Sequence, residues 1–124
     1  MNKNFIIKRC ASCGAIIKLL SDCDNSSIKC CDKEMETLVP NSTSAVVEKH
    51  VPNYEVDGNF ISANVAHVME DDHFIEWICL VSEDKEYFAY FVPGSDAVAK
   101  FPYVPGSTLY SYCNKHGLWK TDVV

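Results

Sequence analysis

Short apolar runs separated by turn-forming residues make up most of the chain after residue 58. Each run is six to ten residues long and is rich in β-branched and aromatic residues. The runs are NFISANVAHV (59–68), HFIEWICLV (73–81), EYFAYFV (86–92), AKFPYV (99–104) and TLYSYC (108–113). The segments between them contain Gly, Pro, Ser and Asp, which favour turns. Short strands at such close spacing predict an antiparallel β-sandwich or barrel.

The run at 73–81 is apolar at nearly every position from Phe74 to Val81. A strand with one face in water alternates polar and apolar residues, so this run predicts a central strand that is covered on both faces. No stretch of the chain shows the 3.6-residue period of a convincing amphipathic helix. The sequence therefore predicts an all-β fold.

The first quarter of the chain has a different character, because it holds five of the seven cysteines and no histidine. The segment LVPNSTSA (38–45) is rich in turn formers and predicts a connection between two units. We therefore expect one unit at 1–37 and a second at 38–124. The smaller unit is too short to bury enough apolar surface on its own, so a bound metal would have to stabilise it.

Composition and charge narrow the possible partners and the location. Apolar residues make up 48% of the 124 residues, which is enough for a hydrophobic core. The net charge of −6 disfavours nucleic acid and acidic membranes as partners. The apolar run near the amino terminus, Phe5–Ile7, is too short for a signal peptide or a membrane span, so we expect a cytoplasmic protein. An odd number of cysteines in that compartment indicates metal or redox chemistry rather than disulfides.

The cysteines of the first unit have the spacing of a metal site. CASCG (10–14) is a C-x2-C knuckle, and KCC (29–31) supplies two adjacent cysteines. Four thiolates from two loops predict a tetrahedral site for iron or zinc. We expect the adjacent pair to distort the tetrahedron by opening one sulfur–metal–sulfur angle. The other explanation is a set of reduced cysteines without metal, and Cys23 is interpreted as a non-ligand.

The histidines form a second candidate set, because all four lie in the predicted β unit together with a Cys-x2-His motif near its end. The set is His50, His67, His73, Cys113 and His116. Four imidazoles and one axial thiolate can form a square pyramid that leaves one position open for chemistry. Structural zinc sites are closed and have four ligands, so five donors argue against a purely structural role.

The order of these motifs resembles that of desulfoferrodoxin, the two-iron class of superoxide reductase. The motifs are C-x2-C-G, Cys-Cys, EKHVP (48–52), H-x5-H followed by FIEWI, and YCNKHGLW (112–119), and they span nearly the whole chain. The resemblance implies a desulforedoxin-like Fe(Cys)4 domain followed by an immunoglobulin-like β-sandwich with a catalytic Fe(His)4Cys centre. It also implies a homodimer, and a rubredoxin-type protein as electron donor.

Carried onto this sequence, the resemblance assigns the two iron sites. The first iron would bind Cys10, Cys13, Cys30 and Cys31, and the second His50, His67, His73, His116 and the axial Cys113. The resemblance also implies that His116 binds through the ring nitrogen that the other three do not use. Backbone N–H groups at Asn114 and Lys115 lie where they can hydrogen-bond to the Cys113 sulfur. Cys23 and Cys79 are left unassigned.

The resemblance implies one-electron reduction of superoxide to hydrogen peroxide without release of dioxygen. Glu48 and Lys49 match a mobile Glu-Lys pair beside the open position. Lys49 is expected to attract the superoxide anion, and Glu48 to bind the ferric iron after turnover and help displace the product. Two other functions are weighed against this one. A rubredoxin-like electron carrier would explain only the four cysteines of the first site, and so would a zinc-ribbon interaction module. Neither explains the five donors of the second set.

Overall fold

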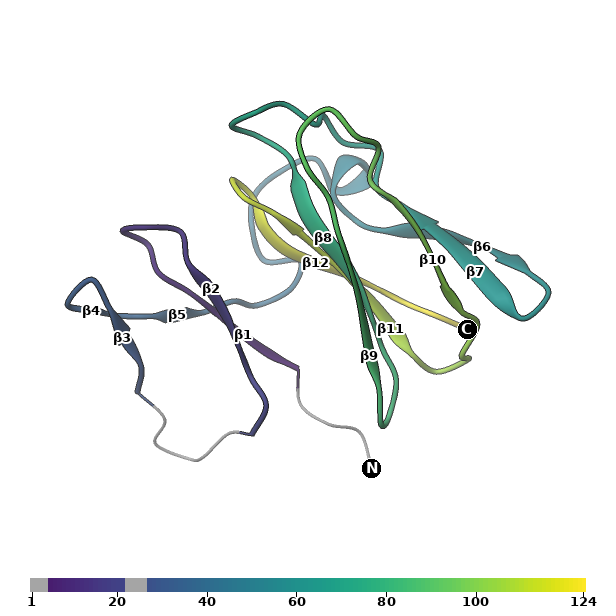
Figure 1. Ribbon diagram of the computed structural model, residues 1–124, viewed down its shortest axis with the longest axis horizontal. Coiled ribbons are helices and arrows are strands. Elements are labelled where there is room, and N and C mark those ends of the chain that lie inside the picture. The colour runs from purple at the N-terminus through teal and green to yellow at the C-terminus, as the bar shows by residue number, and fades with distance from the viewer. Residues whose placement is uncertain (1–4, 22–26) are drawn as a thin grey trace. The chain divides into compact units, whose positions relative to one another are not determined.

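The computed structural model describes residues 5–21 and 27–124 and divides the chain into two compact units (Figure 1). One unit runs to Val39 and the other begins at Pro40. In the described residues the secondary structure is β-strand apart from one 3-10 turn, η1 (Val47–Lys49), which has no buried residue. The all-β prediction is confirmed. Among the described residues, the structure contains no helix with the length and apolar character that crossing a membrane requires.

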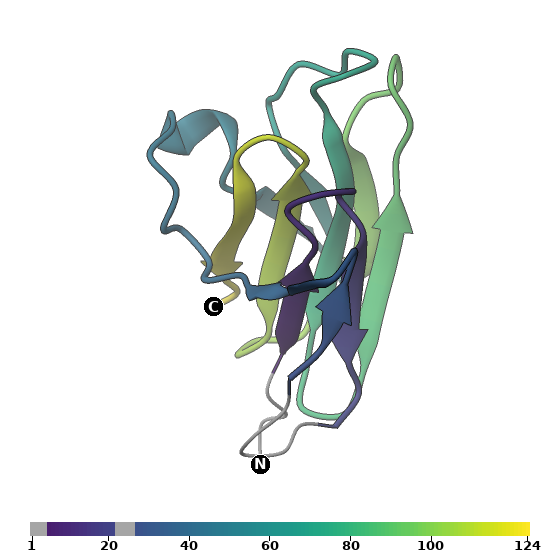
Figure 2. The same cartoon turned by 90° about the vertical axis from the view of Figure 1, so that its left-hand side faces the viewer.

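The first unit consists of two small sheets (Figures 1 and 2). A three-stranded sheet has the order β2-β1-β5, and a hairpin pairs β3 with β4. The bounds are β1 Ile6–Arg9, β2 Ile16–Leu19, β3 Lys29–Cys30, β4 Lys33–Glu34 and β5 Glu36–Thr37. Its buried apolar residues include Ile7, Cys10 and Met35. Lys8 is also buried, and its ammonium donates to Thr37 Oγ1 at 2.9 Å. This is a small core, as expected of so short a segment.

The second unit contains two antiparallel sheets. One sheet has the order β10-β7-β6, and the other has the order β12-β11-β8-β9. The bounds are β6 Asn53–Asp57, β7 Phe60–Asn64, β8 Ile75–Val81, β9 Glu86–Tyr90, β10 Val98–Pro102, β11 Thr108–Cys113 and β12 Gly117–Asp122. Some paired strands are not consecutive in the chain, such as β10 with β7 and β11 with β8. The sheets therefore bring together segments that are far apart in the sequence.

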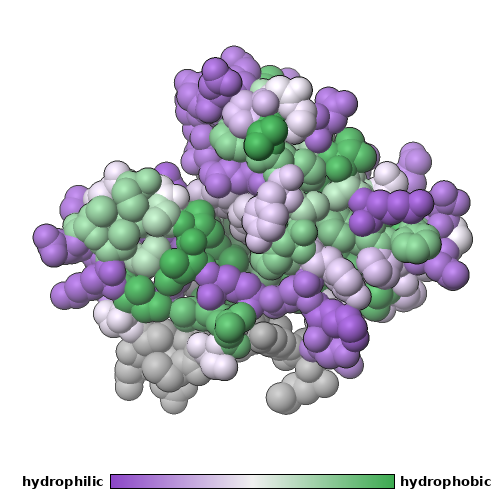
Figure 3. Space-filling view, viewed as in Figure 1, coloured by the Kyte–Doolittle hydropathy of each residue, from purple (hydrophilic) through white to green (hydrophobic). Residues whose placement is uncertain are grey.

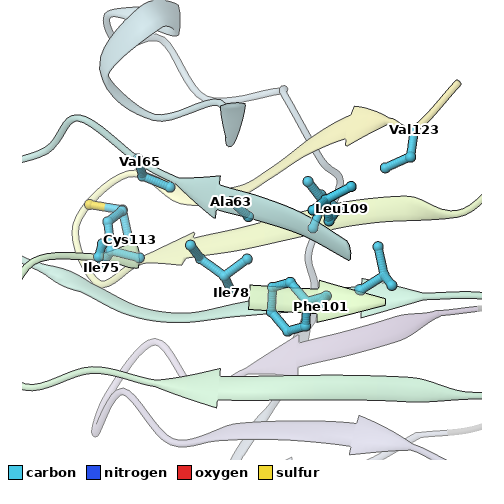
Figure 4. Close-up of a cluster of buried hydrophobic side chains, with 11 residues drawn as sticks. Ala63, Val65, Ile75, Ile78, Phe101, Leu109, Cys113 and Val123 are labelled. Carbon is cyan, nitrogen blue, oxygen red and sulfur yellow. The ribbon is translucent and has the colours of Figure 1, made fainter. Parts of the chain in front are cut away.

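The core of the second unit lies where the apolar faces of these strands meet (Figure 4). Ile61 and Ala63 come from β7, while Ile78 and Leu109 come from the other sheet, and all four are fully buried. Cys113 belongs to the same cluster, beside Ile75 and Val65 at one end of it (Figure 4). A cysteine that the core holds so firmly has a fixed position for its sulfur.

In the second unit the predicted apolar runs agree with the structure, and two further strands were not predicted. Each predicted run overlaps one of the strands β7 to β11, although β10 begins one residue before its run, and β8 is covered on both faces as expected of a central strand. The run at 59–68 is longer than β7, because the chain leaves the sheet after Asn64 and the Val65 N–H bonds to Ala97 O instead. β6 and β12 were not expected. β6 is largely exposed and polar, and β12 begins at a glycine.

Candidate metal centres

The structure brings the nine residues singled out as metal ligands into two groups. In each group the nearest ligand atoms all lie within 4.8 Å of one another. The groups are Cys10, Cys13, Cys30 and Cys31, and His50, His67, His73, Cys113 and His116. Cys79 is buried in β8 and belongs to neither group. Cys23 lies outside the described residues.

The knuckle of the first group is shaped by its backbone. Cys10 follows β1, and the Gly14 N–H closes the turn on Cys10 O at 2.8 Å. Gly14 has φ +79°, a conformation that residues with a Cβ seldom adopt. Backbone N–H groups of Cys13 and Ser12 bond to the Cys10 sulfur, and they lower the pKa of that thiol to about 6. The knuckle is thus built to stabilise a thiolate at Cys10.

The adjacent pair enters the group from the β3–β4 hairpin. Cys31 and Asp32 both have left-handed backbones, with φ 54° and 60°, which turns the second thiol toward the first. The Cys30 sulfur lies 3.7 Å from that of Cys13 and 3.9 Å from that of Cys31. A tetrahedron with metal–sulfur bonds of about 2.3 Å has an edge of roughly 3.8 Å, so the four sulfurs fit such a site.

Charge supports the same conclusion. Hydrogen bonds of the Cys30 thiol to neighbouring sulfurs, that of Cys10 first, raise its pKa, and the negative charge of a Cys10 thiolate acts in the same direction. Four sulfurs this close cannot all ionise unless a cation lies among them. The first group therefore fits Fe or Zn, and the sulfur set alone does not choose between the two metals.

The second group gathers at one end of the sandwich from five places in the chain. His50 follows η1, His67 follows β7, and His73 precedes β8. Cys113 ends β11, and His116 lies in the turn to β12. Gly117 closes that turn with φ +82°, and a Cβ on it would lie 3.0 Å from Thr43 Oγ1. Glycine is therefore required directly after His116.

The ring nitrogens of this group converge. His50 Nε2 lies 3.0 Å from His116 Nδ1 and 3.2 Å from His67 Nε2. The Cys113 sulfur lies 3.4 Å from His67 Nε2 and 3.9 Å from His116 Nδ1. Adjacent donors about 2.1 Å from one ion would be separated by roughly 3 Å, so these separations fit a single metal. His73 Nε2 is buried and has no hydrogen-bond partner in the described structure, which is expected of a donor reserved for a metal.

Hydrogen bonds from the far ring nitrogens fix which nitrogen faces the centre. His50 Nδ1 lies 2.7 Å from Val46 O, and His67 Nδ1 lies 2.5 Å from Val68 O. A backbone carbonyl can only accept, so each Nδ1 carries the proton and each Nε2 keeps its lone pair. His116 differs from these two, since its Nδ1 and not its Nε2 faces the other donors.

Burial sets the protonation of the donors. It lowers the pKa of His67 and of His116, so both imidazoles are neutral near pH 7, the form that binds metals. Burial raises the pKa of the Cys113 thiol, and N–H groups of Lys115 and His116 act in the opposite direction. The expected N–H contact from Asn114 is wrong, because that group donates to Phe74 O at 3.3 Å. Asn114 stands at the start of the turn after β11, so its backbone N–H points toward the residue that precedes β8 and not toward the sulfur.

The Asn114 side chain has a place that the sequence did not suggest. Its Oδ1 accepts from the Phe74 N–H at 3.0 Å, and its Nδ2 donates to Asp72 O at 2.9 Å. These two groups flank His73 in the chain, so one amide holds the backbone on both sides of that histidine. The signal in the sequence was only the position of an asparagine between two candidate ligands.

A cavity of about 390 Å³ opens beside the second group. It is lined by Ala45, Val46, Lys49, His50, His67, Val68, Glu70, His73 and His116. Lys49 thus lies where the sequence places it, whereas Glu48 is exposed on η1 and is not among the lining residues. The carboxylate on the cavity belongs to Glu70, which the sequence did not single out. Backbone pairing of Glu70 with His73 brings it there.

Comparison with known proteins places the chain among relatives of one kind. A family model described as Desulfoferrodoxin matches residues 32–122. A desulfoferrodoxin from Clostridium acetobutylicum is 38% identical over 126 residues, which cover 99% of this chain and 100% of the relative. A desulfoferrodoxin from Nitratidesulfovibrio vulgaris is 32% identical, and the matched residues cover 98% of this chain and 99% of that relative.

Solved structures show the same fold. A superoxide reductase from Treponema pallidum matches with a TM-score of 0.76 at 21% identity, over 97% of this chain and 100% of that one. A superoxide reductase from Giardia intestinalis, described as 1Fe-SOR, matches with a TM-score of 0.51 at 28% identity. That match covers 60% of this chain and 95% of the other.

Proposed function

The chain belongs to the desulfoferrodoxin family, and we propose how its residues divide the work of a superoxide reductase. The activity is the reduction of superoxide by one electron and two protons to hydrogen peroxide, with no dioxygen released. The observation that carries this function is the convergence of four imidazoles and one buried thiol beside an open cavity. The donor sets fit two iron ions per chain, one in each group.

The five donors at the cavity would hold the catalytic iron, with Cys113 supplying the thiolate. When bound, that iron supplies the electron, and the thiolate raises the electron density available for the transfer. The protein keeps Cys113 away from water in its core and bonds its sulfur through two backbone N–H groups. Such bonds reduce the charge on the sulfur and so set the potential of the centre.

Lys49 attracts the substrate. Superoxide is an anion, and the protein carries a net charge of −6, so a local cation is needed to draw the anion toward the centre. The Lys49 side chain lines the cavity together with the histidines. Its ammonium can also donate a hydrogen bond to the reduced oxygen species and hold the water that delivers a proton.

Glu48 takes part after the electron has been transferred. It is exposed on η1, a turn whose first residue lacks a side-chain cap and whose residues are all exposed to water. A movement of this turn would carry the Glu48 carboxylate to the cavity, where it helps displace the product. Glu70 already lines the cavity and keeps a negative charge close to it.

The first unit serves as a second redox centre. Its four sulfurs would hold an iron ion as Fe(Cys)4, and a rubredoxin-type protein would be the electron donor. The reductase acts in the cytoplasm as a homodimer, in accord with the family resemblance. A non-catalytic electron carrier would need the first group only, and it gives no role to the five donors at the cavity. Metal analysis separates these functions: two irons per chain support the reductase, and one iron supports the carrier.

The deciding experiment is the yield of peroxide. Protein reduced without oxygen is mixed with a known amount of superoxide, and the hydrogen peroxide formed per superoxide consumed is counted. A yield near one, with iron oxidised in step, supports reduction. A yield near one half with dioxygen released would mean dismutation, and no reaction would support the electron carrier.

A further inference from the structure

His50 is the most deeply buried imidazole of the second group, with 4% of its surface exposed. Two residues of the neighbouring sheet contact it. The Ser111 hydroxyl donates to His50 O at 2.8 Å, and Ser111 itself is completely buried. The Trp119 ring stacks on the imidazole with centroids 5.0 Å apart and planes inclined by 26°. The backbone and the ring of one ligand are therefore each held by a separate contact.

Ser111 and Trp119 are direct partners across the β11–β12 ladder. Residues opposite each other in an antiparallel pair project from the same face of the sheet, so both side chains reach the segment that carries His50. Trp119 also donates its Nε1–H to His116 O at 3.1 Å. One cross-strand pair thus touches two of the five donors, and these two donors lie 3.0 Å apart.

The position of His50 needs such support because of where it lies in the chain. It directly follows η1, whose residues are all exposed to water. The bond from its Nδ1 to Val46 O fixes the tautomer, but Val46 precedes that same exposed turn. A ligand fixed only to a surface turn would move with it, whereas β11 is an inner strand of the four-stranded sheet. The hydrogen bond from β11 and the stacked ring from β12 give His50 the rigidity of the sandwich.

We propose that Ser111 is a positioning residue of the second metal centre, which works with its partner Trp119 to aim His50 Nε2 at the ion. The proposal rests on the proposed function only in taking this group to be a metal centre. Ser111 does not touch metal or substrate and acts through His50. Removing its hydroxyl leaves a buried carbonyl without a partner, which favours displacement of His50.

The test is the affinity of the full-length chain for Co²⁺ at this centre, followed by absorption. A parallel titration of Cys113→Ser identifies the absorption that belongs to the centre. Second-sphere partners of metal ligands are worth roughly 10- to 100-fold in affinity, and we expect a loss in that range for Ser111→Ala. Ser111→Thr keeps a hydroxyl and should recover most of the affinity.

Ser107→Ala is the matched control. Ser107 is also buried, and its hydroxyl also donates to a backbone carbonyl, that of Val104 at 2.6 Å, but Val104 is not near either ligand group in the chain. A general loss of stability would affect both serine variants equally, whereas a positioning role affects Ser111→Ala alone. Equal cobalt affinities for Ser111→Ala and Ser107→Ala, or no recovery with a folded Ser111→Thr, would overturn the proposal.

Trp119→Phe gives an independent measurement. It keeps an aromatic ring against His50 and removes the N–H that bonds to His116 O. We expect a smaller loss of Co²⁺ affinity than for Ser111→Ala and an altered cobalt spectrum, and an unchanged spectrum would contradict the part assigned to Trp119. Cobalt affinity does not require turnover. Failure of the peroxide test with a clear effect of Ser111→Ala would therefore reject the reductase function and leave the positioning role standing.

Discussion

The two ligand groups are built in opposite ways. In the first unit Cys13 and Cys31 are exposed and Cys10 alone is fully buried, next to few other buried residues. In the second unit the Cys113 sulfur is part of a cluster of buried side chains that runs through both sheets. The first four ligands lie within 22 positions of one another, from 10 to 31, whereas the other five come from 50 to 116. We therefore expect the first unit to need a metal in order to fold, and the second unit to fold first and then hold its metal.

The surroundings of the two groups differ as much as their folds. The second group adjoins a cavity lined in part by Lys49, and hydrogen bonds hold its ligands from outside the metal site. The first group is held mainly by its own knuckle and hairpin. Figure 3 shows hydrophilic residues over much of one face, with hydrophobic residues between them. A stabilising site and a reactive site can therefore be distinguished by what lies around the donors.

Metal removal should affect the two units most differently. With both metals removed by a chelator under reducing conditions, we expect the first unit to unfold and the sandwich to stay folded, because only the sandwich has a sizeable core. Hydrogen exchange reports both units at once: amides of β1 and β2 should lose protection, and amides of β8 and β11 should keep it. Adding Zn²⁺ should restore the first unit. Protected β1 amides in the metal-free protein would show that its core suffices.

The next largest effect is expected from a matched pair of cysteine substitutions. Cys113→Ser should lower the rate of peroxide formation by roughly 100-fold or more, since it removes the only thiolate of the catalytic centre. Cys13→Ser should damage the first centre and leave the reaction of superoxide with pre-reduced protein within about twofold. Rapid mixing of each reduced variant with superoxide measures both rates. Equal losses would mean that the two centres act as one unit.

How far the sequence could predict the molecule follows from the same contrast. Cysteine and histidine are rare and bind metals, so their spacing indicated both ligand groups. Continuous apolar residues indicated β8, but β6 is polar and gave no signal. Glu48 stands next to Lys49 in the sequence, yet the cavity is lined by Glu70, because a backbone bridge to His73 brings it there. The direction of a loop side chain depends on tertiary contacts that the local pattern does not contain.

The contribution of Ser111 could not be predicted for the same reason. A serine within an apolar strand is expected to be a neutral core or surface residue, and only the fold shows that its hydroxyl reaches His50 O. Asn114 is similar, because its two bonds go to residues on either side of His73, about 40 positions away along the chain. Partners of the ligands are therefore visible only once the sheets are assembled.

Lys49→Ala tests the role of the cavity beside the second group. We expect the bimolecular rate with superoxide to fall by roughly three- to tenfold and to depend less on ionic strength, because the cation that focuses the anion is lost. Stopped-flow rates across a salt series give both quantities. Lys85→Ala is the control, since it removes the same charge from an exposed site beside Asp84, and it should leave both nearly unchanged. An equal effect of the two substitutions would assign the attraction to net charge.

Glu48→Ala should leave the bimolecular rate with superoxide nearly intact.

The smallest expected effect is a dependence of stability on pH that belongs to the sandwich alone. Burial lowers the pKa of His67 and His116 in the folded protein, whereas both have ordinary values near 6.5 in the unfolded chain. Below that pH the unfolded chain binds more protons, so stability decreases as the pH falls through about 6.5 and is fully present above it.

In metal-free protein the melting temperature of the sandwich should therefore drop by a few degrees between roughly pH 7 and pH 5.5, as calorimetry can measure. The described part of the first unit contains no histidine and should contribute nothing to this change. His67→Gln keeps a polar side chain without the titrating group and should make the dependence weaker. A slope that is unchanged both in His67→Gln and in His116→Gln would mean that neither imidazole causes the acid sensitivity. The fold would then not hold these imidazoles neutral, and the two units would not differ in the way that their stability depends on pH.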